Sequence, residues 1–598
     1  MRNGEKYHLE DFLTTEAAGD ACFSPDGTQV AYLSTRTGIA QIFLVSMEGG
    51  EPEQLTDFSD PISFVQFSPI ENVLIFGKAE NGNEQIQLYL LDLISRRTSD
   101  LTFRPDVRHN FGGWSPDGKH ICFASNERNG MDLDVYVMDL STRKKRRIFE
   151  EGSWCVSEGF SPSGTYVVIR QEHSSAHTDL YLCTLKTGVI ERITPPGGNA
   201  FYGGAQWLPD ESAFFLMQDQ DREYTGLARY SLAEKKSTYV LTLDWDIDSA
   251  IIDRSGTHVA VLVNEAGYEQ MQVYDAVTFE PSFYRLPPGS AYRIRFSVDG
   301  SHIVFNLADS RRTLDAWVLS LKTGEVRQLT HSRQDVPQEA MVEPELVHFP
   351  SFDGRLIPAF IYRKKVHAPD RKAGVVIHIH GGPAEQYKPV YQPLIQFLVY
   401  AGFVVVAPNI RGSSGYGKTY MALDDAAKRL DSVKDLVALR KYLAGMPNID
   451  SERVALHGTS YGGFMVLACM TFYPNLWASG VDIIGIVNFV TFLENTAPYR
   501  RALREAEYGS LENDRELLEK ISPIHSIEKI EAPLLVIHGA NDPRVPLSEA
   551  RQVVLKLKKA GKQVELLVYS DEGHGVVKLQ NKLGAYPKIV EFLNRTLL

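Results

Sequence analysis

Three side chains in the second half of the chain have the types and the order needed for hydrolysis by an activated serine. Ser460 is the central residue of a Gly-Thr-Ser-Tyr-Gly sequence that follows a β-rich run and precedes an apolar helical run. Asp542 and His574 each come shortly after a further β-rich run. In this order, His574 would take the proton of the Ser460 hydroxyl as the oxygen attacks a carbonyl. Asp542 would orient the imidazole and stabilise its charged form.

Each of these residues also has a structural interpretation. An aspartate in a loop is usually a cap or turn residue, and a lone histidine is usually structural. The three candidates differ because they occur together, in order and at successive strand ends, and this combination favours catalysis. Other polar residues near the same motifs are interpreted as structural, namely His457, His525, His538 and Glu572.

A serine nucleophile also requires hydrogen-bond donors for the negative charge that develops on the attacked carbonyl oxygen. The backbone N–H of Tyr461, the residue after the predicted nucleophile, is one candidate. The second is the backbone N–H of Gly382, within a His-Gly-Gly-Pro sequence at 380–383. Losing one such donor costs about 10²–10³ in rate.

Two other patterns suggest a bound phosphate or metal, and the sequence argues against both. Residues 412–419 fit the G-x-x-x-x-G-K-T pattern of a phosphate-binding loop, but four residues separate them from the preceding strand and no Mg²⁺-binding aspartate is evident. His378 and His380 would share one face of a strand, but no third zinc ligand stands out. We therefore predict no metal ion and no organic cofactor. The five cysteines are scattered, which predicts reduced and mostly buried thiols.

The segments around Ser460 alternate between β-rich and helical. A periodic helix is predicted over 422–443, and the apolar stretch 476–493 is predicted as a buried strand and its following loop, not a membrane span. This alternation predicts a doubly wound, mostly parallel sheet, the α/β-hydrolase fold. The β-rich runs are 375–379, 403–407, 453–457, 534–537 and 564–568.

The first half carries a different signal, a turn sequence repeated seven times. The clearest copies read Phe-Ser-Pro-Asp-Gly at 23–27 and Trp-Ser-Pro-Asp-Gly at 114–118, and successive copies are 43–47 residues apart. Four short strands in about 45 residues make one propeller blade. We therefore predict an all-β seven-bladed propeller. The alternative, a generic β-sandwich array, would not require one constant period.

Composition argues against several classes of function. The chain has 598 residues, of which 62 are Lys or Arg and 75 are Asp or Glu, so its net charge is −13 and nucleic acid is a poor partner. The basic run at 143–147 is predicted as a solvated turn. The first residues lack the apolar segment of a secretory signal, so we expect a cytoplasmic protein with no membrane contact.

Taken together, these motifs resemble the prolyl oligopeptidase family of serine peptidases over nearly the whole chain. Within the family, the glycine-rich sequence at 380–383 is similar to the bacterial acylaminoacyl-peptidase branch, in which a glycine N–H is the second oxyanion donor. Prolyl oligopeptidase proper and the dipeptidyl peptidases use a tyrosine hydroxyl there. The motifs that carry the resemblance lie at 380–383, 409–417, 458–464, 539–542, 545–546 and 572–575.

The resemblance also bears on substrate binding. Dipeptidyl peptidases hold the substrate's amino end with a glutamate pair, but Glu150 and Glu151 lack that context here and are predicted as a solvated turn. The segment 495–509 is similar to bacterial members of the branch, which implies that Arg500 and Arg501 face the substrate pocket. Ion pairing within this segment is the alternative.

The resemblance implies a serine peptidase that hydrolyses short peptides and releases N-acylated or N-terminal amino acids. It also implies three parts, an amino-terminal segment at 1–12 that packs on the hydrolase, a propeller at 13–335 that limits substrate size, and a catalytic domain at 336–598. Family members suggest a homo-oligomer, dimeric or higher. Two alternatives remain, a carboxylesterase that uses the same triad and a non-catalytic propeller scaffold with a degenerate hydrolase.

Overall fold

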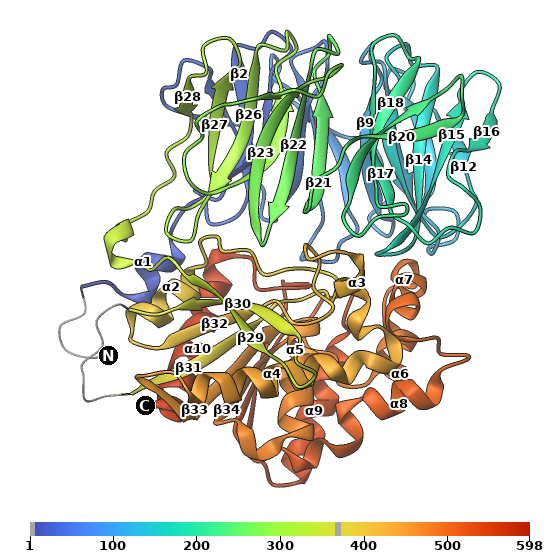
Figure 1. Cartoon of the computed structure of the whole chain (residues 1–598). Helices are drawn as coiled ribbons and strands as arrows, with labels where there is room; N and C mark the ends of the chain where they lie inside the picture. Colours follow the sequence, from blue (N-terminus) through green and yellow to red (C-terminus); the bar gives the residue numbers. More distant parts are fainter. Residues whose placement is uncertain (1–5, 365–371) are drawn as a thin grey trace.

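The computed structural model describes residues 6–364 and 372–598, which form two stacked parts (Figure 1). The first half of the chain forms seven four-stranded antiparallel sheets, and the second half forms an eight-stranded sheet with helices around it. The prediction of a seven-bladed β-propeller followed by an α/β-hydrolase domain is therefore confirmed. Residues 1–5 of the predicted amino-terminal segment lie outside the described residues.

Each blade consists of four strands that are consecutive in the chain. The strands of the propeller, blade by blade, are β1 (Ala18–Phe23), β2 (Gln29–Ser34), β3 (Gln41–Ser46), β4 (Glu53–Gln54); β5 (Ile62–Phe67), β6 (Val73–Lys78), β7 (Gln87–Asp92), β8 (Thr98–Asp100); β9 (His109–Trp114), β10 (His120–Ser125), β11 (Asp134–Asp139), β12 (Lys145–Phe149); β13 (Trp154–Phe160), β14 (Tyr166–Ser174), β15 (His177–Thr184), β16 (Val189–Arg192); β17 (Tyr202–Trp207), β18 (Ala213–Gln218), β19 (Gly226–Ser231), β20 (Lys236–Leu241); β21 (Asp246–Ile252), β22 (His258–Glu265), β23 (Tyr268–Asp275), β24 (Pro281–Ser282); β25 (Ser290–Phe296), β26 (His302–Ala308), β27 (Asp315–Ser320) and β28 (Val326–Gln328).

The repeated turn sequence joins the first two strands of a blade. In the first blade, the Ser24 hydroxyl donates to Asp26 Oδ1 at 2.6 Å, and Asp26 Oδ1 accepts the N–H of Thr28 at 3.1 Å. Gly27 has a φ of 70°, which glycine adopts without strain. The same serine–aspartate bond recurs at 2.6 Å in the third and seventh blades. The repeat is therefore a turn that a local hydrogen bond stabilises.

The propeller has seven separate apolar cores, and each lies between two neighbouring blades. The ring closes between the first and last blades, where Arg295 pairs with Asp20 at 3.1 Å. The Asn306 amide donates to the carbonyl of Ala18 at 2.9 Å. Because each core needs two adjacent blades, the ring must close before the first and last blades can bury their apolar faces.

The sheet of the second half has the order β29-β30-β32-β31-β33-β34-β35-β36. Strand β30 is antiparallel to both of its neighbours, and every other adjacent pair is parallel. The strands are β29 (Glu345–Pro350), β30 (Leu356–Tyr362), β31 (Ala373–Ile379), β32 (Val404–Pro408), β33 (Ile449–Thr459), β34 (Ser479–Ile483), β35 (Leu534–Gly539) and β36 (Val564–Tyr569).

Helices and short 3₁₀ turns connect these strands. The helices of the described residues are α1 (Leu9–Leu13), α2 (Pro393–Tyr400), α3 (Lys418–Met421), α4 (Arg429–Ala444), α5 (Tyr461–Phe472), α6 (Phe489–Asn495), α7 (Pro498–Tyr508), α8 (Arg515–Ile521), α9 (Leu547–Lys559) and α10 (Leu579–Leu597). The 3₁₀ turns are η1 (Gln338–Ala340), η2 (Ala422–Asp424), η3 (Ala426–Lys428), η4 (Pro474–Leu476) and η5 (Pro523–Lys529).

The helix predicted over 422–443 begins later than expected. The residues before Arg429 form η2 and η3, because Asp425 is extended and Ala426 has a φ of 44°, which breaks the helix. The carboxylate of Asp424 is buried and binds the Arg429 guanidinium and the Tyr461 hydroxyl. A buried ion pair between Asp424 and Arg429, five residues apart, spans this break.

The short helix α1 packs on the hydrolase part beside the junction with the propeller (Figure 1). Phe12 lies edge-on against Phe397 of α2, with ring centroids 5.6 Å apart.

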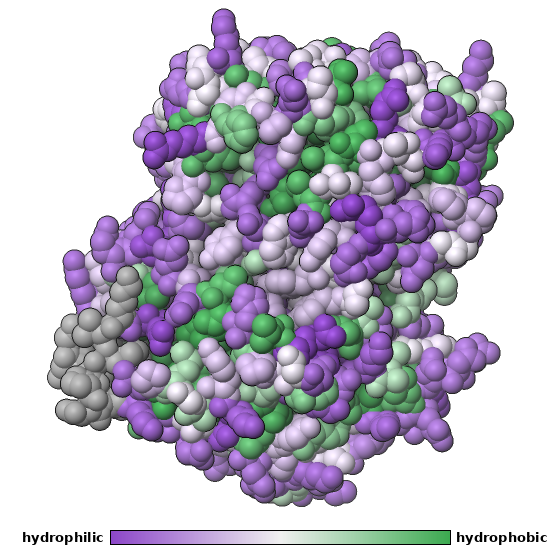
Figure 2. All heavy atoms as spheres, viewed as in Figure 1, coloured by the Kyte–Doolittle hydropathy of each residue, from purple (hydrophilic) through white to green (hydrophobic). Residues whose placement is uncertain are grey.

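Among the described residues, no helix has the length and apolar character needed to cross a membrane. Hydrophilic and hydrophobic side chains are interspersed over both parts on the face shown in Figure 2.

Candidate active site

Ser460 occupies the sharp turn between β33 and α5. Its φ of 60° and ψ of −118° lie in a region that residues other than glycine rarely adopt. Glycines make this turn possible, because a Cβ on Gly458 would overlap the carbonyl oxygen of Gly462. A Cβ on Gly462 would overlap the carbonyl oxygen of Ile379 in β31. A strained serine between two such contacts is typical of a nucleophile elbow.

The structure brings the three predicted side chains into one hydrogen-bonded chain. His574 Nε2 lies 3.0 Å from Ser460 Oγ, and His574 Nδ1 lies 2.7 Å from Asp542 Oδ2. Ser460 follows β33, Asp542 follows β35 and His574 follows β36. These strands run parallel, so their carboxyl ends meet at the same edge of the sheet. This arrangement can move a proton from the hydroxyl to the imidazole.

The Asp542 carboxylate is fully buried and has a partner on each oxygen. Oδ2 faces His574, while Oδ1 accepts the backbone N–H groups of Arg544 at 2.7 Å and Val545 at 3.1 Å. Hydrogen bonds of this kind compensate for burying a negative charge. The carboxylate is thereby fixed in the orientation that holds the imidazole toward Ser460.

Two backbone N–H groups remain available for an oxyanion. Tyr461 is the first residue of α5, and N–H groups in the first turn of a helix have no acceptor within the helix. Gly382 lies in the loop after β31 and lines the same cavity as Ser460. Within the described residues, neither N–H donates a hydrogen bond. The placement is compatible with the predicted oxyanion site.

A cavity of about 420 Å³ opens beside Ser460 and His574. Its apolar lining residues include Ile486, Phe492 and Val545, and the propeller contributes Ser175 from the β14–β15 turn. A larger cavity of about 840 Å³ lies between the propeller and the hydrolase. The two cavities share lining residues, so they adjoin each other.

Arginines from α7 also line the smaller cavity. Arg500 lines it as the sequence predicted, but Arg501 does not, and its guanidinium donates to the carbonyl of Glu494 at 2.8 Å. Arg504 lines the cavity instead. Residues four apart share one face of a helix whereas adjacent residues do not, so the prediction for Arg501 was wrong and Arg504 was missed.

The propeller touches the loop that carries His574. Gly82 lies between β6 and β7 in the second blade, with a φ of 74°. It approaches Gly573 so closely that a Cβ on either glycine would overlap the backbone of the other. The backbone next to the predicted general base is therefore packed against the propeller.

The same propeller loop also contacts the residues beside Asp542. The Asn541 amide donates to the carbonyl of Asn81 at 3.0 Å, and Arg544 Nε lies 2.5 Å from Glu84 Oε1. These contacts could not be predicted from the sequence, because they join segments about 460 positions apart that share no motif.

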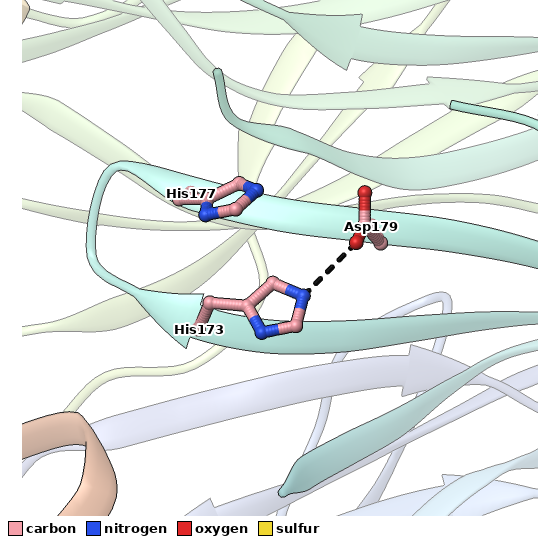
Figure 3. A group of neighbouring side chains, drawn as sticks. All are labelled: His173, His177 and Asp179. Carbon is pink, nitrogen blue, oxygen red and sulfur yellow. Dashed lines mark hydrogen bonds and ion pairs between the residues drawn. The ribbon is translucent and has the colours of Figure 1, made fainter. Parts of the chain in front are cut away.

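One group of possible metal ligands lies on the β14–β15 hairpin (Figure 3). His173 Nε2 lies 3.0 Å from Asp179 Oδ2, and the ring of His177 lies nearby. The other carboxylate oxygen of Asp179 accepts from Arg192 at 2.7 Å and from Thr194 at 2.8 Å. Both carboxylate oxygens of Asp179 thus have partners within the blade, so these contacts serve the blade structure.

The second group is Asp424, Asp425 and Glu507. The Arg429 guanidinium already binds two of its three carboxylates, those of Asp424 and Glu507. A buried arginine held by two carboxylates satisfies the local charge. Neither group therefore argues for a metal-assisted reaction.

The remaining histidines near the site have structural contacts. His380 is buried and bonds to Ser413 at 2.8 Å, and burial lowers its pKa. His378 and His457 face each other through their Nδ1 atoms at 2.9 Å, and burial lowers the pKa of His457 to about 4. His538 bonds to the carbonyl of Val545 at 2.9 Å. These rings are therefore neutral core residues at neutral pH.

The sequence resembling a phosphate loop contacts the propeller. The Lys418 ammonium donates to the carbonyl of Asp219 at 2.9 Å, and the Thr419 hydroxyl donates to Glu223 at 2.7 Å. The lysine and threonine that would bind a nucleotide thus connect the two parts of the molecule.

Comparison with known proteins places this site in context. Residues 390–598 match the model of the prolyl oligopeptidase family. The chain is 25% identical over 589 residues to dipeptidyl aminopeptidase BIII of Pseudoxanthomonas mexicana, and the match covers 93% of this chain and 84% of that protein.

Solved structures share the whole architecture. A puromycin-hydrolyzing peptidase of Mycobacterium tuberculosis superposes with a TM-score of 0.89 at 18% identity, covering 99% of this chain and 96% of the other. The acylaminoacyl peptidase of Pyrococcus horikoshii superposes with a TM-score of 0.76 at 19% identity, covering 99% of this chain and 97% of the other. At these identities the likeness establishes the fold.

Proposed function

The chain belongs to the prolyl oligopeptidase family of serine peptidases, and from that premise we propose that it cleaves short peptides near their amino ends through an acyl-enzyme on Ser460. The observation that carries this proposal is the hydrogen-bonded chain from Ser460 through His574 to Asp542 beside a cavity. The products would be N-acylated or N-terminal amino acids.

The reaction would begin with attack of Ser460 Oγ on the carbonyl carbon of the scissile bond. His574 Nε2 takes the hydroxyl proton, and Asp542 stabilises the imidazolium through Nδ1. The N–H groups of Tyr461 and Gly382 bind the oxyanion. His574 then donates its proton to the leaving amine, which departs and leaves the acyl-enzyme. Water, deprotonated by His574, attacks the ester and releases the acyl product.

The propeller would restrict which substrates reach the serine. It covers the hydrolase (Figure 1), and one of its residues, Ser175, lines the cavity beside Ser460. A cavity of about 420 Å³ next to one of about 840 Å³ has room for a short peptide but not for a folded chain.

The five thiols are all buried and unpaired, which supports a reducing, cytoplasmic setting for the enzyme.

A second candidate is the release of dipeptides from a free amino end. The relative from Pseudoxanthomonas mexicana, similar over 93% of this chain, is named a dipeptidyl aminopeptidase. Glu385 lines the cavity and offers a carboxylate that could bind a substrate ammonium. The two candidates share the mechanism and differ in how the amino end is held.

Matched anilides with acetylated and free amino ends distinguish these candidates. The first candidate predicts turnover of an acetylated amino-acid anilide, and the second predicts turnover only of a dipeptidyl anilide with a free amino end. An alkyl ester tests the carboxylesterase alternative. The peptidase proposal would be overturned if the enzyme hydrolysed the ester but hydrolysed the anilides no faster than a Ser460→Ala control.

A further inference from the structure

Helix α7 places two guanidinium groups on the wall of the catalytic cavity. Arg500 and Arg504 are four residues apart, so they lie on the same face of the helix. Both line the cavity that contains Ser460 and His574. The helix packs against β14 of the propeller, so the two arginines lie on the side of the cavity where the two parts meet.

Neither guanidinium has a partner in the part of the chain that the structure describes. No side-chain hydrogen bond, ion pair or ring contact joins Arg500 or Arg504 to another residue there. The Nε of Arg504 is buried without an acceptor. A buried donor left without an acceptor costs free energy, so an acceptor supplied by a ligand would stabilise Arg504.

The acidic groups around the two arginines are already bound by other arginines. Glu84, Glu172 and Glu507 are the carboxylates concerned. Their partners and distances are Arg544 at 2.5 Å and Arg108 at 3.2 Å for Glu84, Arg170 at 2.9 Å for Glu172, and Arg429 at 2.6 Å for Glu507. Glu385 also lines the cavity, but its side chain is exposed and forms no ion pair with either arginine.

The two positive charges also destabilise each other. Burial, together with the neighbouring charges of Arg544 and Arg504, lowers the pKa of Arg500 to about 10. At neutral pH the guanidinium remains charged, so the cavity wall carries two adjacent positive charges. An anion between them would remove the repulsion and satisfy the free N–H groups.

We propose that Arg500 and Arg504 form a carboxylate-binding subsite that selects substrates carrying a carboxylate close to the scissile bond. The inference rests on the proposed function, because it deepens the substrate class of the same cavity. Guanidinium groups bind carboxylates through two parallel hydrogen bonds, and two of them bind more tightly than one.

A peptide can present that carboxylate in two ways. It can be the side chain of an acidic residue on the acyl side of the scissile bond, or the free carboxyl end of a short leaving group. Both sources place the same chemistry beside Ser460. Two pairs of substrates, one for each source, distinguish them.

The experiment uses two substrate pairs that differ by one carboxylate. The first pair is N-acetyl-glutamyl and N-acetyl-glutaminyl anilide, and the second is one tripeptide with either a free carboxyl end or a carboxamide end. The enzyme should favour the carboxylate member of at least one pair by about tenfold to a hundredfold in kcat/KM. Preference in the first pair identifies the side chain, and preference in the second identifies the chain end.

Variants of α7 link the preference to the arginines. In Arg500→Gln/Arg504→Gln the ratio within the favoured pair should fall to about one. The matched control is Arg501→Gln, which changes the same residue type on the same helix outside the cavity and should keep the wild-type ratio. A ratio near one for both pairs in the wild type, or an unchanged ratio in the double variant, overturns the proposal.

Two further measurements keep the subsite distinguishable from the proposed function. Calorimetric binding of the same pairs to Ser460→Ala measures recognition without turnover, so an enzyme that cleaves none of them still reports on the subsite. Equal binding of both members of each pair overturns it. The melting temperature of the double variant should equal or exceed that of the wild type, because repulsion is removed, and a marked decrease would instead indicate a structural role for the arginines.

Discussion

The serine and the histidine of the site are held in place in different ways. Ser460 depends on backbone contacts inside the hydrolase sheet, where Gly458 and Gly462 leave no room for a Cβ. The loop of His574 depends on a contact with the propeller, where Gly573 meets Gly82. The position of Ser460 therefore depends on the hydrolase fold, whereas the position of His574 also depends on the contact with the propeller.

This difference links the geometry of the site to the position of the propeller. If the propeller moves away from the hydrolase, the elbow keeps its geometry while the loop of His574 loses a neighbour. A displacement of about 1 Å in a catalytic group can lower the reaction rate by a factor of about 10².

The largest expected effect comes from the proton relay itself. Asp542→Asn should lower kcat by about 10⁴-fold, because the amide would hold the imidazole in the wrong tautomer. Steady-state hydrolysis of the best anilide measures it. His525→Gln is the control, since that histidine is exposed and does not line the cavity, and it should leave kcat within a few-fold of wild type. Equal losses in the two variants would contradict the assigned relay.

The elbow can be tested through stability. In Gly462→Ala the new Cβ would overlap the carbonyl oxygen of Ile379, so the free energy of unfolding of the hydrolase should fall by about 3 kcal/mol. Urea denaturation measures it. Gly445→Ala is the control, because its Cβ would come no closer than 3.4 Å to any neighbouring atom. A wild-type midpoint for Gly462→Ala would show that the elbow tolerates a side chain.

The histidine loop should respond in the opposite way. Gly82→Ala should reduce kcat/KM by about tenfold to a hundredfold with little change in hydrolase stability, because it displaces the propeller from Gly573. Gly27→Ala shares the positive φ, 70° against 74°, but no atom lies within 4 Å of its Cβ. If both substitutions have the same effect on activity, backbone strain and not the contact explains the loss.

The elbow side should also show a pH dependence of stability. Burial raises the pKa of Asp482, on the strand beside the elbow, to about 8. The free energy of unfolding is highest below about pH 4, where this carboxyl is protonated in both the folded and the unfolded chain. It falls by up to about 1.4 kcal/mol per pH unit as the pH rises from about 4 to about 8. Asp482→Asn mimics the protonated form, so it should melt higher than wild type at pH 9 and at the same temperature at pH 4. A difference that does not vary with pH would contradict this.

The sequence predicted the parts of the site that follow a strand. Ser460, Asp542 and His574 each come after a parallel strand, so their convergence at one sheet edge follows from topology. Arg501 was predicted and Arg504 was missed because the resemblance located a segment and not the face of its helix. The 3.6-residue period of α7 would have paired Arg500 with Arg504.

Features that depend on contacts between distant segments could not be predicted. At the late start of α4, Asp424 binds Tyr461 and Arg429 binds Glu507, which is 78 positions away, and no local pattern signals these contacts. The approach of Gly82 to the loop of His574 joins the second blade to the last strand of the sheet. One glycine in a turn rich in polar residues carries no mark of such a contact, since most turn glycines only supply a positive φ.

The most direct test of the central claim is the rate at which a fluorophosphonate probe modifies the enzyme, with mass spectrometry to locate the adduct. The relay predicts a single adduct on Ser460 in the wild type and a rate at least about a thousandfold lower in His574→Ala. An adduct on another serine, or equal rates for the two proteins, would contradict the account.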